Sequence, residues 1–229
     1  MTGEAVVRGI IRAEPDVVDG LAKAGVATVH EAGAPDLLDP GIRPIQDGAR
    51  IAGSAVTVSC APGDNIMIHA AVEVIEPGDV LVVATTSPSE NGMFGELLAV
   101  SVAARGCRGL IIDGGVRDVA DLRAIGFPVW ARVIHAARAT KEVAGSVNSP
   151  VVCGGVSVRP GDVVVADDDG VVVVGRERGG EVLEAARQRL LREEETRARL
   201  SSGELGLDLY GFRRRLQDLG VRWVDSLDE

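Results

Sequence analysis

The most informative pattern of apolar and polar positions lies in residues 95–118, GELLAVSVAARGCRGLIIDGGVRD. Its first part predicts a helix, because apolar residues recur at helical spacing and would form a broad apolar stripe. Gly106 is expected to end this helix, and the apolar run 109–112 is expected to form a short buried strand. The stripe consists of Leu97, Leu98, Val100, Val102 and Ala103.

The end of this segment carries candidate chemistry. Asp113-Gly114-Gly115 is expected to turn sharply after the strand and to present Arg117 and Asp118 at its carboxyl end. Open α/β sheets usually bind their ligands at that edge. An equally open interpretation at this point is an ordinary strand–turn–helix, in which Asp118 caps the next helix and Arg117 is solvated.

Helical and strand patterns alternate along the rest of the chain, which predicts a mixed α/β fold. Pro-Gly-Asp turns are expected before the strands that begin at Val80 and Val163, and Asp64 of a third such turn is expected to cap a helix. Further helices are expected at 15–24, 26–32, 66–75, 119–125, 177–200 and 207–219, and further strands at 50–59, 128–131 and near Val151 and Val156.

No linker or composition break divides the 229 residues, so we expect a single domain spanning 1–229. Its last part, about 177–229, is expected to be a helical extension that packs on a neighbouring subunit. The final helix supports this expectation because one of its sides is apolar, with Leu209, Phe212, Leu216 and Leu219.

Composition narrows the function classes. The chain has six aromatic residues and a net charge of −10, which argues against base stacking and against binding to phosphate backbones. It shows neither an export signal nor an apolar run long enough to span a membrane. Its three widely spaced cysteines, Cys60, Cys107 and Cys153, are expected to be reduced core residues. We therefore expect a cytoplasmic globular protein without nucleic-acid or membrane partners.

The acidic run Asp167-Asp168-Asp169-Gly170 has two interpretations. It resembles the start of a calcium loop, but it lacks the later glutamate of an EF-hand. A hairpin turn between two valine-rich strands explains it better.

The residue types near Arg117 suit a small 2-oxo acid. An arginine fork matches a carboxylate in bidentate geometry, and the helix start at 95–98 offers free backbone N–H groups to the same anion. Asp118 can hold a hard divalent cation whose other ligands are water and substrate. Such a cation would stabilise the enolate that a retro-aldol cleavage or a β-keto acid decarboxylation requires.

The chain resembles the 4-hydroxy-4-methyl-2-oxoglutarate / 4-carboxy-4-hydroxy-2-oxoadipate aldolases, the metal-dependent (class II) pyruvate aldolases of aromatic-compound degradation. That family carries Gly-Asp, twenty residues, and then Arg-Asp; here Glu96 is followed by twenty residues and by Arg117-Asp118. The resemblance runs almost end to end through TVHEA (28–32), ARIAGSAVTV (49–58), PGDN (62–65), GFPVW (126–130), KEVAGSVNSPVV (141–152), PGDVVVADDDGVVVV (160–174) and GELGLDLYG (203–211).

This resemblance implies a substrate site. Arg117 would hold the pyruvyl carboxylate, and Lys141 would lie near the distal carboxylate of the substrate or balance acidic neighbours. The backbone that shares the pyruvyl carboxylate would be that of Gly95, Glu96, Leu97 and Leu98. The implied reaction releases pyruvate and a second 2-oxo acid, with oxaloacetate decarboxylase as a side activity.

The resemblance also implies a metal site and an assembly. Asp118 would be the one direct protein ligand of Mg²⁺ or Mn²⁺, and Glu96 would act through a metal-bound water. Glu31 and Glu193 would reach metal waters from an adjacent subunit, which places the site at an interface. The implied fold is a layered α/β/β/α arrangement, a swivelling β/β/α-type domain, assembled as trimers or hexamers.

Two departures from the family affect these expectations. Position 96 is Glu where the family mostly has Asp, and the extra methylene displaces the carboxylate by about one bond length. The loop after Glu31, GAPDLLD, is shorter and lacks an arginine-bearing stretch. Because that loop changes, a different acyl or aldehyde half, or oxaloacetate as the main substrate, stays open.

Three rival functions differ in mechanism. The regulator of ribonuclease activity shares the implied fold and binds an RNA-processing enzyme without catalysis; Lys141 and the C-terminal extension favour the aldolase. A Schiff-base aldolase would need Lys141, because the other lysine, Lys23, lies in an N-terminal helix with nothing nearby to lower its pKa. A phosphohistidine carrier would need an exposed glycine-rich loop, which His30, His69 and His135 all lack.

Overall fold

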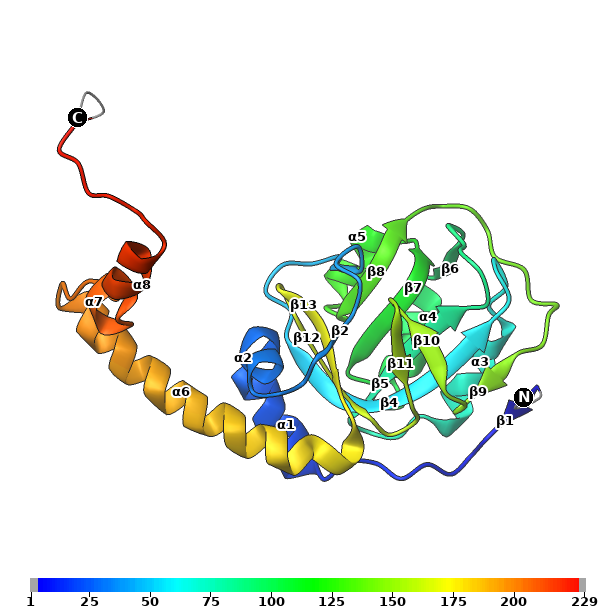
Figure 1. Ribbon diagram of the computed structural model, residues 1–229. Helices are drawn as coiled ribbons and strands as arrows, with labels where there is room; N and C mark the ends of the chain where they lie inside the picture. Colours follow the sequence, from blue (N-terminus) through cyan, green and yellow to red (C-terminus); the bar gives the residue numbers. More distant parts are fainter. Residues whose placement is uncertain (1–3, 227–229) are drawn as a thin grey trace. The chain divides into compact units, whose positions relative to one another are not determined.

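The computed structural model describes residues 4–226, and it divides into two compact units between Arg187 and Gln188. The first unit is a mixed α/β fold built on one curled sheet, shown in Figure 1. This confirms the predicted fold class. The single-domain prediction for 1–229 stays a prediction, as does the docking of residues 177–229 on a neighbouring subunit.

The main path of the curled sheet runs in the order β2-β13-β12-β4-β5-β7-β8-β3. Its centre, β4-β5-β7-β8, is parallel, and β12 and β13 continue it as an antiparallel pair. These strands are β2 Asp36–Leu37, β3 Arg43–Pro44, β4 Ile51–Cys60, β5 Asp79–Thr85, β7 Gly109–Val116, β8 Val129–Ile134, β12 Val163–Asp167 and β13 Gly170–Val174.

Shorter strands extend this sheet or stand beside it. Strand β9 pairs with both β1 and β4, and β6 pairs with β7. Strands β10 and β11 form a separate hairpin. These strands are β1 Ala5–Val6, β6 Gly92–Phe94, β9 Ser146–Val147, β10 Val151–Cys153 and β11 Val156–Val158. The helices of the chain are α1 Pro15–Ala24, α2 Val26–Glu31, α3 Ile66–Ala71, α4 Glu96–Ala103, α5 Val119–Ala124, α6 Gly179–Ser201, α7 Gly206–Leu209 and α8 Phe212–Asp218, with 3-10 turns at Val72–Val74 and Arg176–Arg178.

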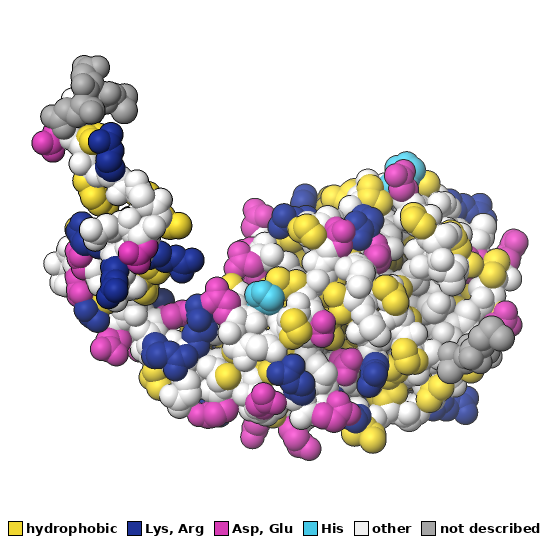
Figure 2. Space-filling view, viewed as in Figure 1, with side chains coloured by type: hydrophobic (Ala, Val, Ile, Leu, Met, Phe, Trp, Pro, Cys, Tyr) yellow, Lys and Arg dark blue, Asp and Glu magenta, His cyan; other side chains and the backbone are white. Residues whose placement is uncertain are grey.

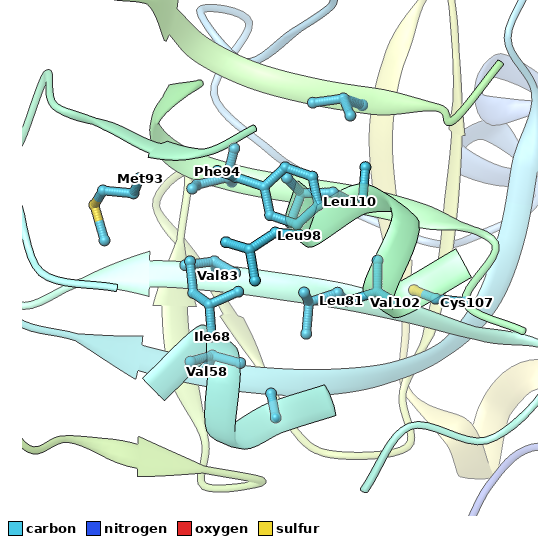
Figure 3. Packing of buried hydrophobic residues seen from close by; sticks show 14 of the residues in the cluster. Val58, Ile68, Leu81, Val83, Met93, Phe94, Leu98, Val102, Cys107 and Leu110 are labelled. Carbon is cyan, nitrogen blue, oxygen red and sulfur yellow. The ribbon is translucent and has the colours of Figure 1, made fainter. Parts of the chain in front are cut away.

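The central strands are apolar on both faces because both faces are covered. Along β5, Leu81 and Val83 pack with α3 and α4, while Val80 and Val82 face a second cluster with Trp130. Figure 3 shows the first cluster, in which Phe94 and Leu98 from the region around Gly95 lie against Leu81, Val83 and Leu110. This packing fixes the start of α4 against the carboxyl ends of the parallel strands.

A third cluster covers the antiparallel side of the sheet. Val18 and Leu21 of α1, Val29 of α2 and Leu183 of α6 pack on the valines of β12 and β13. The predicted hairpin at 167–170 is present, because Asp167 pairs with Gly170 across a two-residue turn. The Asp167 carboxylate accepts the N–H of Val26 at 2.9 Å and that of Asp169 at 3.0 Å, so it supports the start of α2 and the hairpin turn itself.

Two expectations for residues 95–118 are wrong in detail. The strand does not end before Asp113-Gly114-Gly115; β7 continues to Val116, and its register with β8 shifts between Ile112 and Gly115. A Cβ at Gly115 would meet the backbone oxygens of Glu90 and Asn91, so a bulge with glycine replaces the predicted turn. The apolar stripe of α4 is also narrower, since Leu98, Ala99 and Val102 are buried while Leu97 is 80% exposed.

Two helix predictions also need correction. Asn65, not Asp64, occupies the N-cap position of α3, but its side chain makes no capping bond; Asp64, one residue earlier, accepts the N–H of Ile66 at 3.0 Å. The predicted helix at 207–219 is two short helices, α7 and α8, because Gly211 between them has a left-handed φ of 67°.

The second unit contains the end of α6 with α7 and α8. No side chain of α7 or α8 is buried within the chain. Tyr210 stacks obliquely on Phe212 with ring centroids 5.4 Å apart, and Arg213 lies 5.8 Å from the ring centre of Trp223.

Charges of both signs are interspersed over the face drawn in Figure 2. Within residues 4–226, no helix is both long enough and apolar enough to cross a membrane.

Candidate active site

A pocket of about 140 Å³ lies where α4 begins and β7 ends. It brings together most of the side chains predicted for the substrate site. Its lining consists of Asn65, His69, Met93, Gly95, Leu97, Leu98, Arg117, Asp118 and Lys141. Arg117 and Asp118 reach it because β7 continues through the Gly114-Gly115 bulge and delivers them directly beside the first turn of α4.

Asp118 has a backbone conformation that few non-glycine residues adopt. Its φ of 55° and ψ of 38° are left-handed, and its side chain makes no capping bond to α5. This excludes the interpretation of Asp118 as a simple helix cap. Left-handed non-glycine residues cost of order 1 kcal/mol and concentrate at functional sites.

The carboxylate of Asp118 lies against the start of α4. Its Oδ2 accepts the N–H of Glu96 at 3.3 Å and lies 3.6 Å from Nε of Arg117. A Cβ on Gly95 would collide with the same oxygen, so the absence of a side chain at Gly95 permits this approach. Both Arg117 and Asp118 keep about two fifths of their side-chain surface exposed, and a ligand can therefore reach them.

The pocket lining also contains Lys141 and three residues that the sequence did not single out for this site, Asn65, His69 and Met93. Asn65 is buried and donates from Nδ2 to the carbonyl of Met93 at 2.7 Å. His69 follows one turn later on α3; partial burial, and then the charge of Lys141, lower its pKa below the usual value. The PGDN motif at 62–65 is the available signal for Asn65, but as a local pattern it indicates only a turn.

Glu31 and Glu193 do not line this pocket. Glu31 is the exposed last residue of α2, and Glu193 belongs to the second unit, where it forms an ion pair with Arg189 at 2.7 Å. Glu96 contributes its backbone N–H beside Asp118. The predicted roles of these three carboxylates stay predictions.

The donor set suits a hard divalent cation that keeps most of its water. Among residues 4–226, no three His, Cys, Asp or Glu side chains are grouped as a metal cage. Asp118 nevertheless offers an accessible carboxylate beside Glu96, and Mg²⁺ is commonly bound through one or two carboxylates plus water and substrate oxygens. The site therefore fits Mg²⁺ or Mn²⁺ better than zinc, which prefers four nitrogen and sulfur ligands.

The cysteines are not part of this site. All three are free and buried, and burial is the main cause that raises the pKa of Cys60 and Cys153 to about 12 and that of Cys107 to about 11. The structure agrees with the expectation of reduced core residues.

A family model described as Aldolase/RraA matches residues 15–173. A protein of Halalkalibacterium halodurans named "Putative 4-hydroxy-4-methyl-2-oxoglutarate aldolase" is 31% identical over 74% of this chain and 80% of its own length. A protein of the same name from Burkholderia multivorans is 36% identical over 66% of this chain and 94% of its own.

Solved structures show the same fold. Streptomyces coelicolor RraAS2, described as an unusual member of the RNase ES inhibitor RraA protein family, is 30% identical with a TM-score of 0.74, covering 82% of this chain and 99% of that one. An uncharacterized protein of Pseudomonas syringae is 26% identical with a TM-score of 0.75, over 86% of this chain and 97% of its own.

Proposed function

The chain belongs to the Aldolase/RraA family, and on this basis we propose that it is a divalent-metal-dependent lyase that releases pyruvate from a 4-hydroxy-2-oxo acid. The proposed substrates are 4-carboxy-4-hydroxy-2-oxoadipate and 4-hydroxy-4-methyl-2-oxoglutarate, with oxaloacetate decarboxylation as a side activity. The observation that carries the proposal is the pocket in which Arg117, Asp118, Lys141 and the first turn of α4 meet.

Arg117 and α4 supply the proposed binding of the pyruvyl carboxylate. The first N–H groups of a helix have no partner within the helix and carry a partial positive charge, so the amides of Leu97 and Leu98 suit an anion. Arg117 lies beside them in the same pocket and can add a bidentate pair. The carboxylate would thus be held from two sides, with its keto group turned toward Asp118.

Lys141, which lines the same pocket, is proposed to bind the distal carboxylate. Its ammonium group is a flexible point charge, which suits a carboxylate whose position differs between substrates. Together the two cationic groups would orient an elongated dicarboxylate or tricarboxylate across the pocket, with the bond to be broken between them.

Asp118 is proposed to hold Mg²⁺ or Mn²⁺, with Glu96 and, from a neighbouring subunit, Glu31 and Glu193 acting through water. When bound, the cation would supply Lewis-acid stabilisation of negative charge on the keto oxygen. Arg117 would hold the pyruvyl group so that its keto oxygen faces Asp118. The exposed Leu97 side chain would cover the outer side of the substrate. This arrangement needs an assembly of several copies, which we propose to be a trimer or hexamer.

The test is a lactate-dehydrogenase-coupled assay of pyruvate release with the two 4-hydroxy-2-oxo acids and oxaloacetate as substrates. Turnover of at least one 4-hydroxy-2-oxo acid supports the proposal. Turnover of oxaloacetate alone would restrict the function to decarboxylation, and no pyruvate from any of the three would contradict an aldolase.

A second candidate is binding to an RNA-processing enzyme without catalysis. The likeness to Streptomyces coelicolor RraAS2 supports it, because that protein is described as a member of a family of ribonuclease inhibitors. A pull-down with ribonuclease E, together with an absence of pyruvate release, would favour this candidate over the lyase.

A further inference from the structure

We infer that Asp64 is a positioning residue of this pocket: its buried carboxylate holds the segment that carries Lys141 in place over the ligand. The inference rests on the proposed function, because it assumes that Lys141 binds the distal end of the substrate. Asp64 itself does not line the pocket, so it acts through Lys141.

The contacts of Asp64 surround Lys141 in sequence. Its Oδ2 accepts the Thr140 hydroxyl at 2.7 Å and the N–H groups of Glu142 at 2.6 Å and Val143 at 3.2 Å. Asp64 is 1% exposed while Thr140, Glu142 and Val143 are exposed residues, so the buried carboxylate anchors a surface segment. Hydrogen bonds to a charged group are stronger than those between neutral groups.

The Lys141 segment is held by single contacts and not by a helix or a regular strand. Residues 135–145 contain neither helix nor extended strand between β8 and β9. Besides the contacts of Asp64, the backbone of Thr140 forms an isolated bridge to the 63–65 turn. The Thr140 N–H donates to the Gly63 carbonyl at 2.8 Å, and the Thr140 carbonyl accepts the N–H of Asn65 at 3.0 Å. Three to four residues earlier, the segment is also tied to the 91–92 region, where Gly92 N–H binds the Ala137 carbonyl at 2.8 Å and Asn91 donates to the Arg138 carbonyl at 2.8 Å. The contacts directly on either side of Lys141 come from the 63–65 turn.

The same turn connects the remaining walls of the pocket. The other oxygen of Asp64 accepts the N–H of Ile66, where α3 begins, and α3 carries His69. Asn65 reaches Met93 on β6, two residues before Gly95. The 63–65 turn thus sets the position of Lys141 relative to α3 and β6.

Asp64 is ionised at neutral pH. Burial by itself would raise its pKa, but the hydrogen bonds from Ile66, Glu142, Thr140 and Val143 outweigh burial and hold the pKa below its usual value. Asparagine at position 64 would keep the shape of the side chain but lose its charge. Its NH₂ group would also face hydrogen-bond donors where the carboxylate offers an acceptor.

The chain offers a matched control in Asp162, the aspartate of the Pro-Gly-Asp turn at 160–162. Asp162 is also buried, at 7% exposure, and also accepts backbone N–H groups, from Arg159 at 2.8 Å and Arg176 at 3.2 Å. It does not touch the pocket lining. Asp162→Asn therefore reproduces the loss of a buried turn carboxylate without altering Lys141.

The kinetic test is a double-mutant cycle of Asp64→Asn and Lys141→Ala, with Asp162→Asn as control. We expect Asp64→Asn to raise the KM for the 4-hydroxy-2-oxo acid by about tenfold or more, the equivalent of one charged hydrogen bond. Inhibition by pyruvate, which lacks the distal carboxylate, should stay within about twofold. In the double variant, Asp64→Asn should add nothing to the loss caused by Lys141→Ala, because the two act as a unit.

A multiplicative effect in the double variant would overturn the inference, as would equal losses in Asp64→Asn and Asp162→Asn. If Asp64→Asn does not fold, Thr140→Val replaces it, since it removes one donor and leaves the carboxylate with the other three. It should then raise the KM in the same selective way, and an unchanged KM would count against the inference.

Residue-resolved hydrogen exchange separates this inference from the proposed function. Asp64→Asn should speed exchange of the Glu142 and Val143 amides by about tenfold or more and leave Arg159 and Arg176 unchanged, while Asp162→Asn should do the reverse. Unchanged exchange at Glu142 and Val143 would overturn the role of Asp64 even in an active enzyme. If the wild type releases no pyruvate but the exchange pattern holds, the proposed function fails and the tethering of the segment stands.

Discussion

The carboxylate of Asp118 accepts a 3.3 Å hydrogen bond from the backbone N–H of Glu96. Asp118, the proposed metal ligand, is thus hydrogen-bonded to the first amide of α4. The same helix is proposed to bind the substrate carboxylate. Oδ2 of Asp118 also lies 3.6 Å from Nε of Arg117, the other proposed partner of the substrate carboxylate. The Asp118 carboxylate and an incoming substrate carboxylate would therefore compete for Arg117 when no cation neutralises Asp118.

The first prediction concerns substrate binding without metal. Replacing Asp118 with Ala should tighten metal-free binding of pyruvate by about threefold to tenfold, because a like charge near the incoming carboxylate is removed. The same change should abolish the gain in affinity that Mg²⁺ gives the wild type. Titration calorimetry with pyruvate, with and without Mg²⁺, measures both effects. Asp121→Ala, which removes an exposed carboxylate from nearby α5, should change neither; weaker metal-free binding in Asp118→Ala would contradict the competition.

The second prediction concerns Gly95. Its φ of −154° is ordinary extended backbone, so Ala is tolerated by the main chain, but the new Cβ would collide with Oδ2 of Asp118 and lie 3.2 Å from Cγ of Arg117. We expect Gly95→Ala to lower kcat/KM by about tenfold or more with a change of only a few degrees in Tm. Gly175→Ala is the control, because nothing lies within 4 Å of its Cβ. Full activity in Gly95→Ala would show that the close approach of Asp118 is unnecessary.

The third prediction concerns Arg117. Lysine keeps the charge but loses the planar fork, so Arg117→Lys should lower kcat/KM by tens-fold, or roughly 2 kcal/mol. Arg105→Lys, a substitution at an exposed arginine that does not line the pocket, should behave as wild type. Steady-state kinetics with the best 4-hydroxy-2-oxo acid give the comparison, and near-normal values for Arg117→Lys would remove Arg117 from carboxylate binding.

The fourth prediction concerns the thiols. A raised pKa means that each thiol stays protonated at pH 8, and the thiolate is the reactive form. Because burial raises the pKa of Cys60, Cys107 and Cys153 to between about 11 and 12, iodoacetamide should label none of them in the native protein. Mass spectrometry should show three additions after denaturation. Rapid labelling of the native protein would show that one cysteine is accessible.

Much of the fold follows from local pattern. The parallel strands are continuous apolar runs because both faces are buried, and the Asp167–Gly170 hairpin follows from its turn residues. The end of β7 did not follow, because Gly114-Gly115 indicates a turn unless the backbone oxygens of residues 90 and 91 are known to lie against it. The exposure of Leu97 on α4 was equally unpredictable, since an apolar residue beside a pocket has the same local pattern as one in the core.

The site was predictable in part. The sequence predicted that Arg117, Asp118 and the start of α4 share one site, from the usual place of ligands at strand ends and from the free amides of a helix start. The inclusion of Lys141 came from the family resemblance. The role of Asp64 depends on contacts across 76 to 79 residues of sequence, and that of Asn65 on a contact across 28, which no local pattern contains. The proposed roles of Glu31 and Glu193 likewise have no local pattern in the sequence, because they need a second copy of the chain.

The metal dependence of pyruvate release is the most direct test of the proposed lyase. Wild-type protein is stripped with EDTA, assayed with 4-carboxy-4-hydroxy-2-oxoadipate and 4-hydroxy-4-methyl-2-oxoglutarate, reconstituted with Mg²⁺ or Mn²⁺, and treated in parallel with borohydride and pyruvate. We predict that EDTA abolishes pyruvate release, that either cation restores it in the wild type but not in Asp118→Ala, and that borohydride leaves Lys141 unmodified. Undiminished activity in EDTA, or a borohydride-stable adduct on Lys141, would contradict the metal-dependent mechanism.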